Sequence, residues 1–271
     1  MTELVVRRLL IDLNEPFERH WNGGDAFRSA LFNALSMSFP AGEQFFIDSV
    51  RAAVKRLPQG ASGPFEAEIK GFIGQEATHR RIHALFNGQL VRQGYVNGWE
   101  ARITERVRRL VGADPRHAVA ITAATEHITA VLAEHRLTHP QALAGSQARL
   151  RTMWLWHSSE ESEHRSTAFD VYRALGGDET WRRRWMRSVT LFFITDMLRQ
   201  TLDNLRHDGA LLRWSTWRSA ASFLFGRDGL VRHAFKPWRA YFAPGFHPSQ
   251  QGGELGTQWL RDNSQQYVAV K

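Results

Sequence analysis

Residues 156–164 read Trp-His-Ser-Ser-Glu-Glu-Ser-Glu-His, and histidine and glutamate recur in this stretch at the spacing of helix turns. Side chains three, four and seven positions apart lie on one face of an α-helix. His157, Glu161 and His164 have this spacing. Imidazole and carboxylate groups are typical ligands of iron, manganese and zinc. The stretch therefore predicts a helix that presents metal ligands on one face.

A second Glu-x-x-His pair, Glu76 and His79, occurs earlier in the chain. A single glutamate precedes each pair, Glu43 before the first and Glu126 before the second, and both stand among apolar or small neighbours. A glutamate that faces a core is rarely left ionised unless it is paired or binds a metal. One glutamate from each of two helices and a Glu-x-x-His pair from each of two others form the ligand set of a dinuclear site inside a four-helix bundle.

Apolar residues at helical spacing, interrupted by glycine and proline, predict a chain that is nearly all helix. Pro40 either kinks a helix that begins after Asp25 or starts the first ligand-bearing helix. Further helices are expected over about residues 98–111 and 181–206. The ligand-bearing helices are expected at about residues 40–57, 65–93, 115–137 and 147–175. The predicted fold is all-α, a four-helix bundle with a dinuclear metal site in its core and additional C-terminal helices.

The composition changes after the last predicted bundle helix. Residues 1–177 are expected to form the metal-binding bundle with its N-terminal lead-in. Residues 178–271 contain many aromatic residues and are expected to form a helical cover packed on the bundle, in the same domain or as an extension. The sequence leaves open whether this cover lines a substrate pocket or forms a dimer contact.

The predicted metal ligands are seven side chains that come from all four of these helices. His157 has an alternative role as a packed helix histidine beside Trp154 and Trp156. No catalytic residue is predicted beyond the ligands, and no motif that binds an organic cofactor is identified. The seven ligands are Glu43, Glu76, His79, Glu126, His157, Glu161 and His164.

Residues beside the ligands leave alternatives open. His83 lies on the same helix face as the first Glu-x-x-His pair, and it is an eighth ligand, a partner that orients a glutamate, or a core residue. Glu160 is an additional ligand, a group that supports a ligand from behind, or a surface residue. Glu161 is preferred as the ligand because it repeats the Glu-x-x-His spacing. Glu163 is expected to point into solvent.

Composition excludes several classes of site and protein. The chain has 271 residues, of which 43% are hydrophobic and 23% charged, as in ordinary globular proteins. It has no cysteine, which excludes disulfides, thiolate metal sites and a cysteine nucleophile. Its longest apolar stretch, residues 189–195, is far shorter than the roughly 20 residues of a spanning helix. A cytoplasmic protein without a transmembrane segment is expected.

The net charge of +8 raises the question of a nucleic-acid partner. Arginine carries nearly all of this charge, in clusters such as residues 102–109 and 182–187. These clusters lack the interleaved aromatic residues of a platform on which bases stack. Solvated helix faces or interface arginines are favoured, and no nucleic-acid partner is expected.

The motifs around the ligands resemble those of a known family. The chain is similar to a bacterial ferritin-like family described as predicted metal-dependent hydrolases, over about residues 1 to 260. The position of His157, four residues before Glu161, also resembles that of an additional histidine in di-iron arylamine N-oxygenases. This second resemblance is confined to the ligand positions, and it implies that the seven side chains are the full ligand set. The family motifs lie at residues 38–46, 74–79, 156–164 and 246–248.

The first functional hypothesis is a non-haem di-iron or Mn/Fe oxidase or oxygenase that activates O₂ to oxidise a small or apolar organic substrate. It requires two metal ions per chain, with iron expected first, Mn/Fe open and zinc less favoured. Its partners are the substrate and O₂, with an electron-donor protein and a homodimer left open. Four aromatic side chains are expected to line the substrate pocket: Phe46, Phe72, Trp154 and Phe169.

Two other functions remain open. A dinuclear metal-dependent hydrolase would use a metal-bridging hydroxide, and it would work with redox-inert zinc and without O₂. An iron-binding or storage protein would form a large hollow assembly, which leaves the aromatic C-terminal third unexplained.

Overall fold

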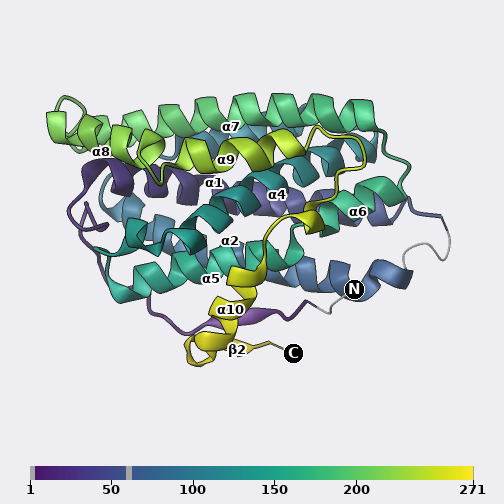
Figure 1. Cartoon of the computed structure of the whole chain (residues 1–271), viewed down its shortest axis with the longest axis horizontal. Helices are drawn as coiled ribbons and strands as arrows, with labels where there is room; N and C mark the ends of the chain where they lie inside the picture. Colours follow the sequence, from purple (N-terminus) through teal and green to yellow (C-terminus); the bar gives the residue numbers. More distant parts are fainter. Residues whose placement is uncertain (1–3, 59–62, 271) are drawn as a thin grey trace.

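The computed structural model describes residues 4–58 and 63–270, and its ligand-bearing helices run roughly along one common direction (Figure 1). α1 packs against α2 and α4, and α5 packs against α4 and α2. The faces that carry the glutamates and histidines therefore enclose a common interior. The four helices are α1 (Ala26–Val54), α2 (Glu66–Arg92), α4 (Pro115–Thr138) and α5 (Ala148–His164).

Two of these helices begin at capping residues that the sequence supplies. The Asp25 side chain accepts a hydrogen bond from the backbone N–H of Arg28 at the start of α1. Asp114 caps α4 in the same way, and Pro115 occupies the first helical position. These caps satisfy backbone donors that a helix start leaves without partners. The predicted start of a helix after Asp25 is confirmed.

Pro40 does not start a new helix, because it lies inside α1, which runs continuously from Ala26 to Val54. Proline lacks the N–H that would bond to the carbonyl four residues earlier, which belongs to Ser36. In the structure, the side chain of Asn87 on α2 donates to that carbonyl at 2.9 Å. The hydrogen bond that Pro40 removes is thus replaced from the neighbouring helix, and this contact could not be read from local sequence.

The helix predicted over residues 147–175 is two helices, because α5 ends at His164 and α6 spans Thr167–Ala174. The break falls at Arg165, whose guanidinium donates to the carbonyl of Gly252 in the C-terminal segment. Ser166 then takes the N-cap position of α6. No glycine or proline marks this interruption in the sequence.

The remaining helices cover the bundle. α3 (Gly98–Arg108) packs on α1, and α7 (Glu179–His207) packs on α1 and α4. α9 lies on α4, α8 contacts α1 and α9, and α10 lies on α5 and α4. The helix predicted over about residues 181–206 is confirmed by α7. The other bounds are α8 (Trp214–Phe225), α9 (Leu230–Ala240) and α10 (Glu254–Asp262), with 3₁₀ turns at Gly63–Phe65, Pro140–Leu143, Pro248–Gln250 and Ser264–Gln266.

The chain also contains two short strands, which the all-α prediction did not include. β1 (Arg7–Leu9) pairs antiparallel with β2 (Tyr267–Ala269), so the two ends of the described chain lie together. Figure 1 shows this pair and α10 on the opposite side of the bundle from α7. The division of the chain near residue 177 stays a prediction. In the described residues, no helix is both long and apolar enough to cross a membrane.

The polar interior lies between two apolar clusters. On one side, the ring of Phe39 packs 4.5 Å from that of His83 and 4.7 Å from that of His157, measured between centroids. On the other side, the Phe72 ring meets the His164 ring edge to face at 5.1 Å. The bundle therefore holds its glutamates and histidines in a volume that side chains close from both directions.

Candidate metal centre

The seven predicted ligands converge from four helices on one buried volume. α1 supplies Glu43, α2 supplies one Glu-x-x-His pair, α4 supplies Glu126, and α5 supplies the remaining three side chains. Glu161 is the most exposed of the seven, at 3%. Burial of four carboxylates in one place is costly unless cations or hydrogen bonds compensate their charge.

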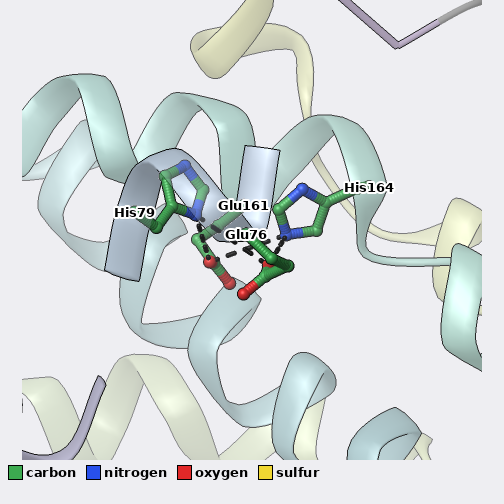
Figure 2. Close-up of side chains that lie close together, drawn as sticks. All are labelled: Glu76, His79, Glu161 and His164. Carbon is green, nitrogen blue, oxygen red and sulfur yellow. Dashed lines mark ion pairs between the residues drawn. The ribbon is translucent and has the colours of Figure 1, made fainter. Parts of the chain in front are cut away.

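Four of these side chains form a compact group (Figure 2). His164 Nε2 lies 3.0 Å from Glu76 Oε1 and 3.6 Å from Glu161 Oε1. His79 Nδ1 lies 3.6 Å from the same Glu161 oxygen. Glu126 Oε2 approaches this group from α4, at 3.3 Å from His164 Nε2. Oxygen and nitrogen atoms at these separations can surround a single metal ion.

A second group contains Glu43, His83 and His157. His157 Nε2 lies 2.9 Å from Glu161 Oε1 and 3.9 Å from Glu43 Oε1. Glu161 thus touches histidines of both groups. A carboxylate in this position can bridge two ions, which is its role in dinuclear centres of helix bundles.

Most of the polar atoms that face the centre lack hydrogen bonds, and the bond between His157 Nε2 and Glu161 Oε1 is an exception. Both carboxylate oxygens of Glu43, Glu76 and Glu126 have no hydrogen-bond partner among residues 4–58 and 63–270. The same holds for His79 Nδ1 and His164 Nε2 within those ranges. Buried polar groups are nearly always satisfied, so a cluster of unpartnered carboxylates and imidazoles is typical of residues that bind cations. The residues fit a pair of divalent ions.

The electrostatics of the carboxylates support the same conclusion. Burial raises the pKa of Glu43 and Glu76 well above the usual value, and neighbouring glutamates raise both further. Burial, together with nearby Glu161, raises the pKa of Glu126 to about 7. Like charges in a low-dielectric interior repel one another, and bound cations would reverse this effect.

Two histidines are held neutral. Burial lowers the pKa of His79 to about 3 and, together with the adjacent His79, that of His157 to about 4. A neutral imidazole has a lone pair that can bind metal. Burial opposes the charged form of His164 as well, but Glu126, Glu161 and Glu76 together raise its pKa well above the usual value.

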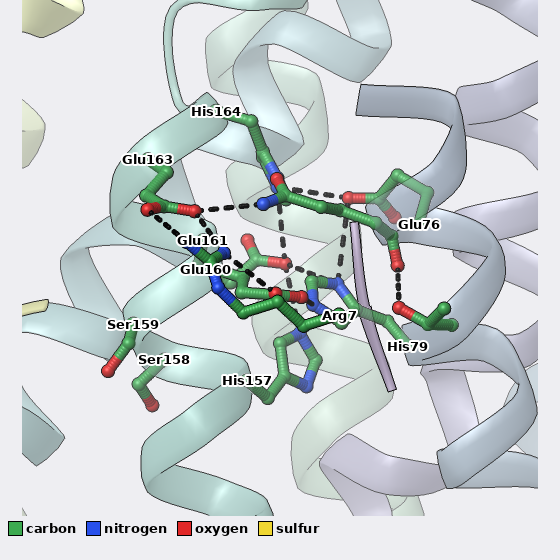
Figure 3. A network of polar contacts seen from close by, with 12 residues as sticks. Arg7, Glu76, His79, His157, Ser158, Ser159, Glu160, Glu161, Glu163 and His164 are labelled. Carbon is green, nitrogen blue, oxygen red and sulfur yellow. Dashed lines mark hydrogen bonds and ion pairs between the residues drawn. The ribbon is translucent and has the colours of Figure 1, made fainter. Parts of the chain in front are cut away.

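Glu160 orients His79 from behind (Figure 3). Its Oε2 lies 2.9 Å from His79 Nε2, so the Nε2–H donates to it and Nδ1 is left facing the centre. Glu160 is fully buried, which excludes the surface alternative. Burial raises its pKa to about 8, and the Arg7 guanidinium, which bonds its other oxygen at 3.0 Å, opposes this rise. Such partners fix the tautomer and direction of a ligating histidine.

Glu163 does not point into solvent as predicted. It accepts hydrogen bonds from Arg7 at 2.7 and 3.0 Å, and its side chain is only 20% exposed. Gln75 donates to Glu163 at 2.8 Å and accepts from His164 Nδ1 at 2.8 Å. Gln75 therefore fixes His164 as Glu160 fixes His79, and it leaves Nε2 of His164 facing the centre.

The sequence did not single out Arg7 or Gln75. Arg7 reaches the centre because the N-terminal segment lies directly on α2, where Gly71 and Gly74 have no side chain. A Cβ at these glycines would collide with Leu4 and Val6 respectively. A glycine pair three residues apart inside a helix is the signal that could have predicted this close approach.

His83 joins a chain of hydrogen bonds. Its Nδ1 lies 2.8 Å from Ser36 Oγ, and its Nε2 lies 2.6 Å from His157 Nδ1. Both ring nitrogens are thus engaged, while His157 Nε2 faces Glu43 and Glu161. His83 thus supports His157 and not a glutamate, which was the supporting role predicted for it. Ligation by His83 stays a prediction, since it belongs to the second group of possible ligands.

A cavity of about 300 Å³ approaches the centre between α1, α3, α4 and α7. Of the four aromatic side chains predicted to line a pocket, only Phe46 lines this cavity. Phe72, Trp154 and Phe169 are buried in the two apolar clusters instead. These three rings therefore belong to the hydrophobic core and not to the wall of the cavity.

Comparison with known proteins shows which protein family the chain belongs to. No curated protein and no solved structure matches it. A family model described as predicted metal-dependent hydrolase matches residues 5–252, which is nearly the whole chain. The match agrees with the resemblance of the ligand motifs, and the buried glutamates and histidines agree with a family that depends on metal. The chain belongs to the family of predicted metal-dependent hydrolases.

Proposed function

We propose that the protein is an enzyme with two divalent metal ions in the core of a ferritin-like four-helix bundle. One observation carries the proposal: unpartnered carboxylate and imidazole atoms from four helices face one buried volume. Glu160 accepts a hydrogen bond from His79, and Gln75 accepts one from His164. These hydrogen bonds direct the other ring nitrogen of each histidine toward that volume. The proposed ligands are the seven side chains named above.

The donor set restricts the metal. Oxygen and imidazole donors without thiolate suit iron, manganese or zinc. We propose iron first, with a mixed Mn/Fe pair as the alternative. Elemental analysis of the purified protein tests this, and about two ions per chain are expected. A preparation that binds fewer than one ion per chain under iron, manganese or zinc loading would contradict the proposal.

Membership in the family favours hydrolysis as the reaction. Two bound cations would supply Lewis acidity at the bond that is cleaved. The protein would position the ligands, because Glu160 and Gln75 hold His79 and His164 in place. Burial of the site would keep bulk water away from the ligands.

Oxidation with O₂ is the second candidate, and the wall of the cavity favours it. Ser38 donates its hydroxyl to the carbonyl of Leu35 at 2.7 Å, within its own helix. Thr125 and Thr129 likewise donate to carbonyls of α4, at 2.9 and 3.0 Å. These three hydroxyls are therefore not free to donate to a developing oxyanion, which an acyl-transfer site commonly requires. The other hydroxyl that lines the cavity, Ser188, belongs to α7 and not to a ligand-bearing helix. The engagement of the three hydroxyls suits the oxidation of an apolar group.

Metal replacement without oxygen separates the two reactions. The metal-free protein is loaded anaerobically with Zn²⁺ or Fe²⁺ and offered p-nitrophenyl esters of different chain lengths. Hydrolysis predicts turnover with Zn²⁺ in the absence of O₂. Oxidation predicts no turnover with Zn²⁺, and O₂ uptake by the Fe²⁺ protein when air is admitted. O₂ uptake without any zinc-supported hydrolysis would reject the first reaction in favour of the second.

The proposed partners depend on the reaction. For oxidation they are a small organic substrate, O₂ and an electron-donor protein. Native mass spectrometry separates an enzyme from an iron store. We expect a monomer or homodimer, whereas a large hollow assembly would support storage.

A further inference from the structure

The cavity between α1, α3, α4 and α7 has an apolar wall and an arginine-rich end. We propose that it binds the substrate, and that the substrate is an apolar molecule with one carboxylate group. The apolar part would lie toward the metal centre and the carboxylate at Arg109. This inference rests on the proposed function for the chemistry that follows binding, but the binding itself can be tested alone.

The inner end of the cavity is separated from the metal centre by single side chains such as Phe39, whose ring packs 4.7 Å from that of His157. Phe39, Gly42 and Phe46 line it from α1, within one turn of Glu43 on either side. Thr125 and Thr129 line it from α4, on the turns next to Glu126. The supports Glu160 and Gln75 stand behind the histidines of α2 and α5. A ligand in the cavity would thus approach from the side of the two single glutamates.

The wall between the two ends is apolar. Trp99 and Ile103 line it from α3, and Trp185, Val189 and Phe193 line it from α7. Burial of hydrocarbon against such a wall contributes about 25 cal/mol per Å² of apolar surface. The hydrocarbon part of a ligand would therefore gain most of its affinity here.

The outer end carries more positive than negative charge. Arg106 and Arg109 line the cavity from the end of α3. Arg106 is paired with the buried carboxylate of Asp196, which Arg102 also binds at 2.6 Å. Arg108 and Arg109 share a single carboxylate, that of Glu105, at 2.9 and 3.0 Å. Of these groups, Arg106, Arg109 and Asp196 line the cavity, and the Asp196 carboxylate is already paired with Arg106. The lining therefore has more positive than negative charge, and the exposed Arg109 is the group that a ligand carboxylate would meet.

The test is calorimetric titration of the metal-loaded protein with decanoate and with 1-decanol. The two probes have the same hydrocarbon chain, and only one carries a charge. We expect decanoate to bind at least about tenfold more tightly than decanol, because a charged hydrogen bond adds to the same apolar contact. Equal affinities would overturn the assignment of the carboxylate, and no binding of either probe would overturn the site.

Arg109→Gln tests the outer end, and Arg108→Gln is its matched control. The two arginines are adjacent, both pair with Glu105, and their side chains are 71% and 72% exposed. Only Arg109 lines the cavity. The first substitution should weaken decanoate binding about five- to tenfold and leave decanol unchanged. The control should change neither, and equal losses in both variants would show a general charge effect that contradicts the proposal.

Gly42→Leu tests the inner end, and Gly88→Leu is its control. A Cβ at Gly42 would meet only Phe46, at 3.9 Å, so a leucine there would extend into the cavity. Gly88 on α2 also has open space around its Cβ position but does not line the cavity. Gly42→Leu should abolish binding of both probes, while Gly88→Leu binds them normally. Unimpaired binding by Gly42→Leu would place the ligand elsewhere.

Metal analysis of the same samples separates failure of this inference from failure of the proposed function. The titrations are repeated after chelation, because a carboxylate could also bind the ions directly. Arg109-dependent binding that persists without metal supports the cavity site. Binding that requires metal and is unaffected by Arg109→Gln would reject the cavity site but would not contradict the proposed metal centre. Normal probe binding by a protein that takes up no metal would reject the proposed function alone.

Discussion

At the residue scale, the histidines of the centre depend on the groups behind them. Glu160 accepts from His79 Nε2 and is held in turn by Arg7. Glu160→Gln keeps the shape of the side chain but replaces one of its two oxygens with an NH2 group, so it cannot accept from both His79 and Arg7. We expect metal affinity to fall about 10- to 100-fold, as for other partners of ligating histidines. Competition with a chelator measures this. Glu66→Gln, at the exposed start of α2, the helix that carries His79, should leave affinity unchanged.

His157 and His83 should respond differently to substitution. His157 Nε2 faces Glu43 and Glu161, whereas both nitrogens of His83 are engaged by Ser36 and His157. His157→Ala is therefore expected to lower the metal content from two ions to one. His83→Asn should keep two ions and bind them more weakly, by about tenfold. Elemental analysis checks both variants. Loss of an ion from His83→Asn alone would show that His83 is the ligand.

At the scale of elements, α1 and α2 are joined where Pro40 leaves the carbonyl of Ser36 without its helical partner. Asn87 supplies the donor. Asn87→Ala is expected to cost about 1–3 kcal/mol of unfolding free energy, because it leaves a buried carbonyl unsatisfied. In a Pro40→Ala background, the backbone N–H returns and the cost should shrink. Urea unfolding of the four proteins in this cycle measures the coupling. Equal costs in both backgrounds would show that the two residues act independently.

Two glycines on α2 decide where the N-terminal segment lies. Gly71 and Gly74 let Leu4 and Val6 approach the helix backbone, which brings Arg7 of β1 to Glu160. The strand pair β1–β2 then ties this segment to the end of the chain. The short sheet thus contributes to the metal centre through one side chain, although it is far smaller than any bundle helix.

At the scale of the whole molecule, metal binding should be coupled to folding. The metal-free interior contains four buried carboxylates that raise one another's pKa or compete for the same histidines. Ligands that bind only the folded state stabilise it, by about 2.7 kcal/mol at a concentration 100 times Kd. Chelation should therefore lower the urea midpoint, and Fe²⁺ or Mn²⁺ should restore it. Ca²⁺, which prefers all-oxygen sites, should restore less. An unchanged midpoint after complete removal of metal would contradict this.

The sequence by itself determined the ligand-bearing faces. The spacings of Glu76 to His79 and of His157, Glu161 and His164 are local, and helix periodicity alone puts each set on one side of its helix. Capping by Asp25 and the approximate helix positions are local for the same reason. The family could also be recognised, because its motifs are short and continuous.

Only the tertiary structure decided which residues support that centre. Arg7 and Glu160 are 153 positions apart, and no periodicity relates a strand residue to a helix residue at such a distance. The donor that replaces the N–H missing at Pro40 and the side chains that line the cavity also come from segments far apart in the sequence. Local patterns fix the direction of a side chain on its own helix, whereas packing of the folded chain decides what that side chain meets.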